Sequence, residues 1–374
     1  MMKNKNLKIL LVMGSAAAPV PNSEMFKDNI YDSLVKLGYD VILIQFDKFL
    51  KKHQRETSED QKRILEEHII KTYKSEGPFD FFLGFLSDQQ VTPDLYIELN
   101  KDVFTLNWTC NSHQFDDLHK TISPYVGLNT YIWKNHETLY DSVGAKSYWL
   151  PMAANEGQYT RSKNKDIDIS FVGSAYGNRP YYIWRLLQSG VGLQLFGPGW
   201  QFNNTISNLL RLYVAPILYN FNFNEKKLHY LDKSMRCFIQ KQIMGMTSVG
   251  GIPDDNEYSE ILSRSQVSLN FPESRKDNDY LNYEVNFGCN FRDFEIPLSG
   301  SMLLTQDSLE FDFFYERDKE AISFGNENDL IEKAKYYSNN RAAAKRIADA
   351  GYQRAIKDHT WGRRFEQLFN YLTN

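Results

Sequence analysis

The chain has 374 residues, of which 42% are apolar and 24% charged, with a net charge of −4 and a pI near 6.0. This composition excludes a disordered chain, and the acidic balance argues against nucleic acid as the main partner. The length exceeds what one hydrophobic core usually serves, so two domains are expected.

The three cysteines, Cys110, Cys237 and Cys289, lie far apart and form no Cys-x-x-Cys pair. Neither a disulfide framework nor a structural zinc site is expected, and a reducing cytoplasm fits best. The apolar run at 7–13 is too short to span a membrane and lacks the cleavage site of a signal peptide. We therefore expect a cytoplasmic protein without a membrane span.

The first half of the chain alternates between strand and helix patterns. An apolar run at 7–14 is followed by a small-residue loop, a helical pattern up to Gly38, and a second apolar run at 39–47. Strand, helix and strand within about 40 residues indicate a βαβ unit and a parallel sheet. Charged residues 51–75 predict a solvated helix, and further strands are expected at 79–86 and 103–109.

A second alternating series follows the segment at 147–156. Strand patterns and helix patterns take turns along it. We expect strands at 166–174, 191–200 and 301–305, a helix at 179–189, a helix and strand within 258–271, a helix starting near Glu295, and helices within 327–357.

The predicted fold class is α/β, with two Rossmann-like domains facing across a cleft. The first domain spans 1–150, joined by a C-terminal helix at 355–374, and the second spans 151–354 with an inserted helical segment at about 201–250. Between 211 and 241 this insertion has six basic residues and two acidic ones. We interpret this insertion as a helical hairpin with its own core. The alternative is an element that binds a membrane surface or the acceptor.

Two turns of the second domain have the character of an anion site. One strand ends at Gly173 and Ser174, and Arg179 then opens a helix. Glycine turns expose backbone N–H groups, and arginine adds a bidentate phosphate contact. The alternative is a plain strand–turn–helix with a surface arginine. A second turn at Gly197, inside the stretch LFGPGW, ends the next strand at the same edge of the sheet; taken alone, it is better interpreted as a turn glycine beside a core tryptophan.

The stretch NFRDFEIPLSGSMLLT at 290–305 carries the strongest candidates. Arg292 and Glu295 are three residues apart and share one face of a helix. A surface salt bridge between them is the simpler interpretation. In the functional one, Arg292 neutralises a diphosphate, Glu295 accepts hydrogen bonds from ribose hydroxyls, and Gly300 lets the backbone approach the ligand.

Taken together, these motifs resemble the spore maturation protein B type of glycosyltransferases, which belong to the group 1-like enzymes with the GT-B fold. The resemblance rests on four motifs in order: FVGS-x-YGNR, FG-x-GW, Leu269-Asn270 and N-x-R-x-FEIP-x-x-G-x-x-LLT. The C-terminal segment and the junction SYWLPMAANE also resemble that family, whereas 201–250 does not.

This resemblance implies a nucleotide-sugar donor in the second domain, an acceptor glycan or glycoconjugate in the first, and no metal or other cofactor. Arg179 and Arg292 are then expected to stabilise the departing diphosphate. The implied donor-binding residues are Gly173, Ser174, Tyr176, Arg179, Gly197, Asn270, Arg292, Glu295 and Gly300. One position departs from the pattern of retaining enzymes: Phe287 stands where a first glutamate is expected.

A catalytic base, if the sugar is inverted, is expected in the first domain. His113 is the leading candidate, and Asp116 and Glu24 are alternatives. The pairs Asp116-Asp117 and Asp254-Asp255 lack the strand-end Asp-x-Asp form of a metal-dependent transferase. Three other functions stay open: a non-catalytic nucleotide- or sugar-binding scaffold of a cell-surface assembly, a nucleotide-sugar 2-epimerase, and, less favoured, a nucleic-acid glucosyltransferase.

Overall fold

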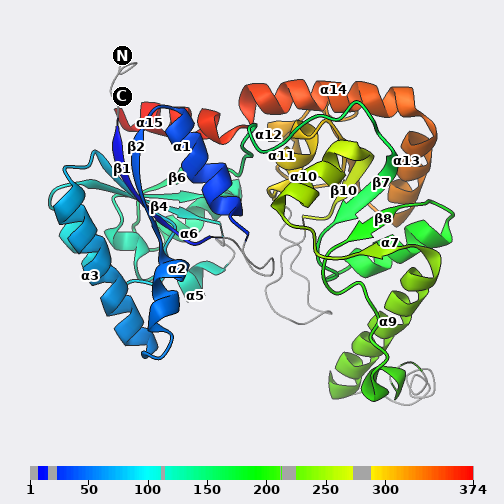
Figure 1. The fold of residues 1–374 in the computed structure, drawn as a ribbon, viewed down its shortest axis with the longest axis horizontal. Helices are drawn as coiled ribbons and strands as arrows, with labels where there is room; N and C mark the ends of the chain where they lie inside the picture. The colour runs from blue at the N-terminus through cyan, green and yellow to red at the C-terminus, as the bar shows by residue number, and fades with distance from the viewer. Residues whose placement is uncertain are drawn as a thin grey trace. The chain divides into compact units, whose positions relative to one another are not determined.

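The computed structural model divides the chain into two units by internal contacts. Unit 1 comprises Met1–Gln158 and Lys357–Asn374, and unit 2 comprises Tyr159–Ile356 (Figure 1). The structure describes residues 7–15, 23–110, 114–210, 212, 225–272 and 288–373. None of the helices in these ranges is both long and apolar enough to cross a bilayer. The predicted cleft between the domains stays a prediction.

Unit 1 is built on a parallel six-stranded sheet with the order β2-β1-β3-β4-β5-β6. Its strands are β1 (Lys8–Met13), β2 (Asp40–Gln45), β3 (Phe81–Gly84), β4 (Phe104–Thr109), β5 (Leu128–Tyr131) and β6 (Ser147–Trp149). Its α-helices are α1 (Asp32–Lys36), α2 (Phe46–Leu50), α3 (Ser58–Glu76), α4 (Pro93–Leu99), α5 (Phe115–Leu118), α6 (Glu137–Asp141) and α15 (Trp361–Thr373). Short single-turn or π-helical pieces lie at Lys27–Tyr31, Lys51–His53, Ser123–Tyr125 and Lys134–His136.

The C-terminal helix α15 packs on the sheet of unit 1. The Trp361 ring meets the Trp108 ring of β4 edge-on, with centroids 5.4 Å apart. Phe369 stacks on Phe81 of β3 at 5.3 Å. These aromatic contacts explain how the last residues of the chain join the first unit.

Unit 2 is built on a second parallel sheet with the order β12-β11-β10-β7-β8-β9. Its strands are β7 (Ile167–Val172), β8 (Gln194–Phe196), β9 (Val249–Gly250), β10 (Ser265–Asn270), β11 (Met302–Gln306) and β12 (Ile322–Phe324). Its helices are α7 (Arg179–Gln188), α9 (Glu225–Met246), α10 (Asp255–Arg264), α11 (Arg292–Leu298), α12 (Phe311–Phe314), α13 (Glu327–Asn339) and α14 (Arg341–Asp358). Read from β9, the order is the Rossmann order 3-2-1-4-5-6.

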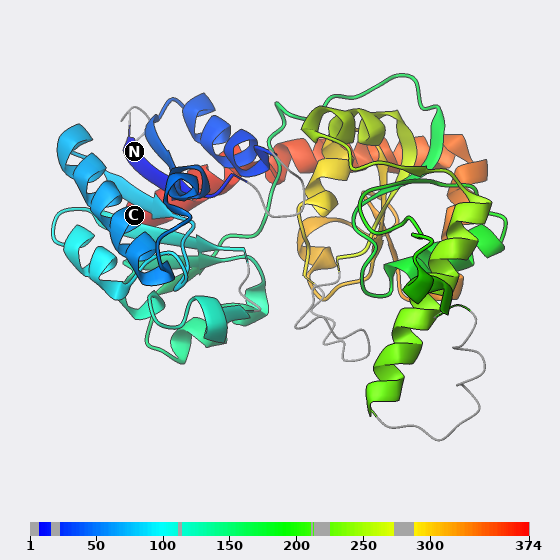
Figure 2. The same cartoon turned by 60° about the horizontal axis from the view of Figure 1, so that its bottom comes forward.

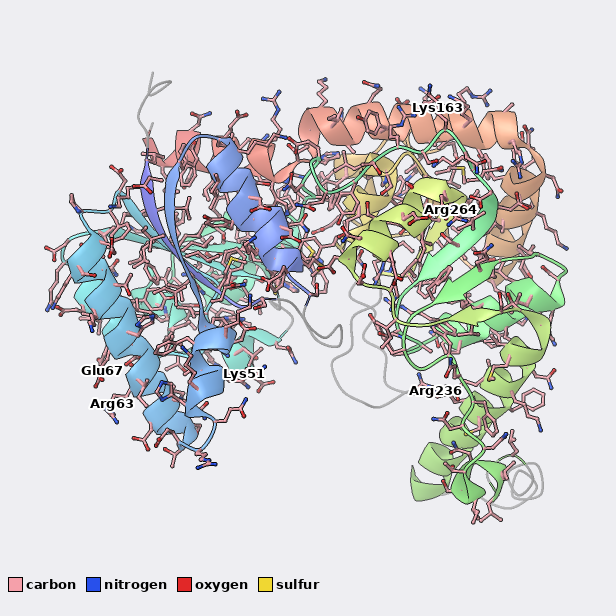
Figure 3. The ribbon with its side chains drawn as sticks, in the orientation of Figure 1. Lys51, Arg63, Glu67, Lys163, Arg236 and Arg264 are labelled. Atoms are coloured by element: carbon pink, nitrogen blue, oxygen red, sulfur yellow. The ribbon has the colours of Figure 1, made fainter. Side chains whose placement is uncertain are left out.

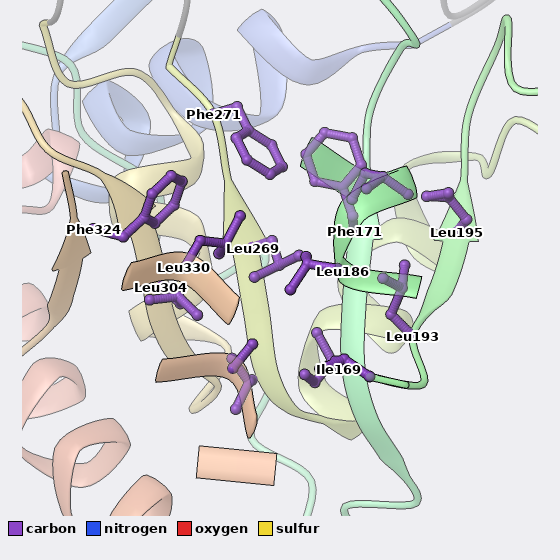
Figure 4. Packing of buried hydrophobic residues seen from close by; sticks show 14 of the residues in the cluster. Ile169, Phe171, Leu186, Leu193, Leu195, Leu269, Phe271, Leu304, Phe324 and Leu330 are labelled. Atoms are coloured by element: carbon purple, nitrogen blue, oxygen red, sulfur yellow. The ribbon is translucent and has the colours of Figure 1, made fainter. Parts of the chain in front are cut away.

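The core of unit 2 lies between its sheet and its helices, and Figure 4 shows it around β7 and β10. Phe171, Leu269 and Leu304 come from neighbouring strands, and Leu186 of α7 and Leu330 of α13 close over them. A parallel sheet covered on both faces needs strands that are apolar along their length. This is why the apolar runs of the sequence coincide with the central strands, which Figure 2 shows from a second side.

The structure confirms the α/β class and most predicted elements, and it differs from the prediction at several short elements. Strands β5, β9 and β12 were not expected, and β6 lies inside the segment interpreted as a junction. Helix α11 begins at Arg292, before the predicted start at Glu295. In the insertion at 201–250, α9 is helical, whereas residues 211 and 213–224 lie outside the described residues.

Candidate functional site

The candidate site lies where the strand order of the second sheet reverses. Strand β7 is the first of the series, and its neighbours β8 and β10 continue the sheet in opposite directions. In open α/β sheets, ligands bind at the carboxyl ends of the strands beside such a switch point. Here the chain leaves β7 at Gly173 and leaves β10 at Phe271.

Arg179 ties these two strand ends together. Its Nη2 donates to the carbonyl of Phe271 at 2.6 Å, and its Nη1 donates to the carbonyl of Ser174 at 3.3 Å. The guanidinium also stacks on the Tyr176 ring, 3.8 Å from its centroid, and the side chain is only 1% exposed. The alternative of a surface arginine is therefore wrong, because Arg179 is buried and holds backbone groups in place, whereas its predicted diphosphate contact stays a prediction.

The two predicted glycine turns pack directly against each other. A Cβ at Gly197, where φ is +120°, would lie 2.5 Å from the Gly173 carbonyl oxygen. That same carbonyl accepts a hydrogen bond from Trp200 Nε1 at 2.6 Å, and the Gly173 N–H donates to Phe196. Gly197 and Trp200 thus fix the Gly173 turn, and the backbone N–H of Gly173 is already used by the sheet edge.

Arg292 lies over this turn. A Cβ at Gly173 would lie 3.2 Å from Arg292 Nη2, so only glycine leaves the guanidinium its present room. Burial works against the charge, but the nearby oxygens of Tyr258, Tyr176 and Glu295 raise the pKa of Arg292. Its Nε is buried and has no hydrogen-bond partner among the described residues. Arg292 is thus a cation with donor capacity left over at the switch point.

Glu295 is held by two tyrosines from distant parts of the chain. Tyr159 donates to Oε1 at 2.7 Å and Tyr258 donates to Oε2 at 2.5 Å. The side chain is 2% exposed, and this burial raises the pKa of Glu295 even though the hydroxyls and Arg292 oppose the shift. The simple surface salt bridge is wrong, because Glu295 is a buried carboxylate whose oxygens accept tyrosine hydroxyls.

Asp293, which the sequence did not single out, anchors the start of α11. Its Oδ2 accepts the Asn290 N–H at 2.8 Å, and its Oδ1 accepts the Thr305 hydroxyl at 2.9 Å. Asn270, at the end of β10, donates to Asn290 Oδ1 at 3.2 Å. Burial raises the pKa of Asp293 to about 6. The Asn270 amide therefore helps to position α11, and its predicted contact with the ligand stays a prediction.

Gly300 lies apart from the other predicted donor residues, which is a correction. It precedes β11, at the amino ends of the strands, whereas the switch-point residues follow the carboxyl ends. A Cβ there would lie 2.8 Å from Arg161 Nε, and φ is +70°. Gly300 therefore ends α11 and packs on Arg161, which excludes it from the set at the switch point.

The three candidates for the catalytic base in unit 1 have different surroundings. His113 lies outside the described residues. Asp116 is exposed and pairs with Lys120 at 3.0 Å. Glu24 accepts from Gln45 Nε2 at 2.7 Å and pairs with Lys48; burial opposes these contacts, but together they lower the pKa of Glu24. A lowered pKa makes Glu24 the weaker base.

The acidic pair Asp254-Asp255 has a structural role. Asp254 caps α10, accepting the Glu257 N–H at 2.9 Å, and the Glu257 carboxylate accepts the Asp254 N–H in return. Among the described residues, no group of three or more His, Cys, Asp or Glu side chains is placed to hold a metal ion. Metal independence stays a prediction.

Comparison with solved structures defines the class of the fold. Sucrose-phosphate synthase from Thermosynechococcus elongatus is 11% identical, with a TM-score of 0.59 over 98% of this chain and 99% of that one. The Anabaena protein HepE, solved with UDP and glucose, is 10% identical, with a TM-score of 0.60 over 98% and 99%. A Rickettsia africae glycosyltransferase is also 10% identical, with a TM-score of 0.60 over 98% of each chain. The chain has the GT-B fold of two Rossmann-like domains.

A family model narrows the class. Residues 185–370, about half of the chain, match the family described as "Glycosyl transferase-like". With the GT-B fold, this match identifies the protein as a glycosyltransferase. No match was found among curated protein sequences.

Proposed function

We propose that the protein transfers a sugar from a nucleotide diphosphate sugar to a glycan or glycoconjugate, and that unit 2 binds the donor. The observation that carries this proposal is Arg292. Its guanidinium lies against Gly173 at the switch point, and its buried Nε has hydrogen-bonding capacity left over. A diphosphate supplies the acceptor oxygens and the negative charge that such a group lacks.

The proposed roles follow from the contacts of each side chain. Arg292 contacts the diphosphate and stabilises the charge on the departing nucleotide. Glu295 accepts from the ribose hydroxyls, since each carboxylate oxygen has a second lone pair beside its tyrosine bond. Arg179 is a positioning residue, which holds the Ser174 and Phe271 carbonyls and thereby the shape of the turn.

Unit 1 is proposed to bind the acceptor, with transfer that needs no metal or other cofactor. If transfer inverts the sugar, His113 remains the first candidate for the base, because, against the effect of burial, Lys48 and Gln45 lower the pKa of Glu24, and Asp116 is paired with Lys120. The Anabaena neighbour was solved with UDP, which makes UDP the first nucleotide to test.

The sequence motifs support a narrower assignment to the spore maturation protein B type, acting in the cytoplasm. Peripheral membrane contact through 201–250 is part of this proposal. Exposed apolar side chains there support it: Ile206, Leu210, Phe238, Met244 and Met246. Flotation with vesicles of phosphatidylcholine, with and without phosphatidylglycerol, tests the contact, and a Phe238→Ser/Met244→Ser variant that floats equally well contradicts it.

Calorimetric titration with UDP, GDP, ADP, CMP and dTDP, once with EDTA and once with magnesium, tests the donor site. We expect one nucleotide to bind equally in both conditions, and its sugar conjugate to be consumed when acceptor is present. Binding without turnover of any activated sugar favours the non-catalytic scaffold. Failure of all five nucleotides to bind contradicts the transferase proposal and favours a scaffold in which Arg292 and Glu295 have a structural role.

A further inference from the structure

A cavity in unit 2 lies at the opposite edge of the sheet from the candidate donor site. It has a volume of about 490 Å³ and is lined by the segment before β7, the start of β10, Gly300 before β11, and one face of α14. These lie at the amino ends of the strands, whereas Arg292 and Glu295 lie beside the carboxyl ends. We call it the basic cavity.

The side chains around the basic cavity are mostly cations. Arg161, Lys163 and Lys165 come from the segment before β7, and Arg341 and Lys345 come from α14. Asp349 is the only carboxylate in the lining. Figure 3 shows Lys163 beside α14. Five cations around one carboxylate leave an excess of positive charge in a confined space.

The acidic groups nearby leave part of this charge uncompensated. Asp349 pairs with both Arg161 and Lys345, and Asp168 pairs with Arg341 at 2.6 Å. Among the described residues, Lys163 and Lys165 form no ion pair with a carboxylate; Lys165 Nζ donates instead to the Ser263 carbonyl at 2.5 Å. Burial and the neighbouring Arg161 lower the pKa of Lys165 to about 8.

Contacts with α14 and with the backbone hold the arginines of the basic cavity in place. The Arg161 guanidinium stacks on the Tyr352 ring of α14, 4.3 Å from its centroid, and packs on the backbone of Gly300. Arg341 Nη1 donates to the Lys165 carbonyl at 3.3 Å, which joins α14 to the same segment. Preorganised cations lose less conformational entropy when an anion binds.

We propose that the basic cavity is a second anion-binding site, which takes a small molecule or headgroup carrying phosphate groups. Phosphate matches the point charges of Lys163 and Lys165, which pair with no carboxylate among the described residues, while Arg161 adds positive charge beside them although it is paired with Asp349. A volume of this size accommodates more than one phosphate group. The site is independent of the nucleotide proposal, because none of its lining residues belongs to the set at the switch point.

The test is calorimetric titration of the full chain with pyrophosphate and with inorganic phosphate, at constant ionic strength. The measurement is made in wild type and in Arg292→Met, so that binding at the donor site is recognised by its loss. Lys163→Gln and Lys165→Gln remove one charge each from the basic cavity. Lys335→Gln on α13 is the matched control, since Lys335 is exposed and lies outside the cavity lining.

We expect pyrophosphate binding that persists in Arg292→Met, weakens about tenfold or more in Lys165→Gln and severalfold in Lys163→Gln, and is unchanged in Lys335→Gln. Because Lys163 is exposed, its variant keeps the test valid if Lys165→Gln unfolds. Vesicles of phosphatidylcholine with phosphatidic acid distinguish a lipid headgroup from a free phosphate compound. Binding of neither phosphates nor vesicles, or equal binding in all lysine variants, overturns the proposal.

Discussion

Replacing each of the two buried arginines by methionine separates ligand contact from positioning. Methionine keeps the apolar stem and removes the guanidinium. In Arg292→Met, a diphosphate loses a charged partner in a desolvated place, which costs about 2–4 kcal/mol, or about 30- to 700-fold in the dissociation constant of UDP. Uridine, which has no phosphate, should bind wild type and Arg292→Met equally.

Their effects on folding should run in the opposite order. Arg292→Met removes an Nε that has no partner among the described residues, but it also removes the cation that stabilises the buried Glu295 carboxylate. Its cost in unfolding free energy should therefore be smaller than that of Arg179→Met, not zero. Arg179→Met leaves the carbonyls of Ser174 and Phe271 without their donors. Two charge-assisted hydrogen bonds at about 1.5–3 kcal/mol each predict a loss of about 3–6 kcal/mol in unfolding free energy.

Urea unfolding and UDP titration on the same samples check both expectations. Tenfold or smaller weakening of UDP in folded Arg179→Met is expected, because the turn is loosened and no phosphate contact is lost. The reasoning is refuted if folded Arg179→Met binds UDP more weakly than Arg292→Met does. It is equally refuted if Arg292→Met binds UDP as wild type does.

Three further changes address the frame of the site. Gly197→Ala should lower the free energy of unfolding by about 2 kcal/mol or more, since its Cβ would meet a backbone carbonyl at 2.5 Å; Gly192→Ala, with open space, is the control for thermal melting. Tyr258→Phe removes a hydrogen-bond donor to Glu295, so the pKa of Glu295 should rise further. As the pH is lowered, the variant should therefore begin to lose UDP affinity at a higher pH than wild type does. The folded protein raises the pKa of Asp293 to about 6, so it binds the proton more tightly than the unfolded chain does. The stability that this proton contributes is present below about pH 4 and is lost as the pH rises to about 6. Unfolding free energies relative to Asp293→Asn should fall by about 3 kcal/mol over that window, and a flat difference would contradict the assignment.

The sequence predicted the strands that have a strong apolar pattern. It missed the short strands that form only because a neighbouring strand offers hydrogen-bond partners. The apolar runs of β1 and β7 identify buried parallel strands without any structure. Strand β9 has two residues and β12 has three, which is too short for a pattern to appear. These strands exist because an established sheet edge offers them hydrogen-bond partners, which no local signal records.

The same division holds for the site. Spacing alone placed Arg292 and Glu295 on one helix face, but the partners of Glu295 come from far along the chain. Tyr159 lies 136 residues away and Tyr258 lies 37 residues away. Only folding brings them together, so the two tyrosines were invisible to sequence reasoning. Arg179 was expected to contact the diphosphate, which stays a prediction. Its burial against the Ser174 and Phe271 carbonyls has no sequence signature, and it supports the positioning role that we propose.

The chemistry of the site follows from how each buried charge is compensated. Arg179 is compensated by backbone carbonyls, and Glu295 by tyrosine hydroxyls. Asp293 is compensated by hydrogen bonds and by a pKa that burial moves towards neutrality. Arg292 keeps a buried donor without a partner, and such a group raises the free energy of the empty protein. Binding a diphosphate would relieve that cost. Because both Nη groups of Arg179 already donate to backbone carbonyls, we expect Arg292 rather than Arg179 to recognise the ligand.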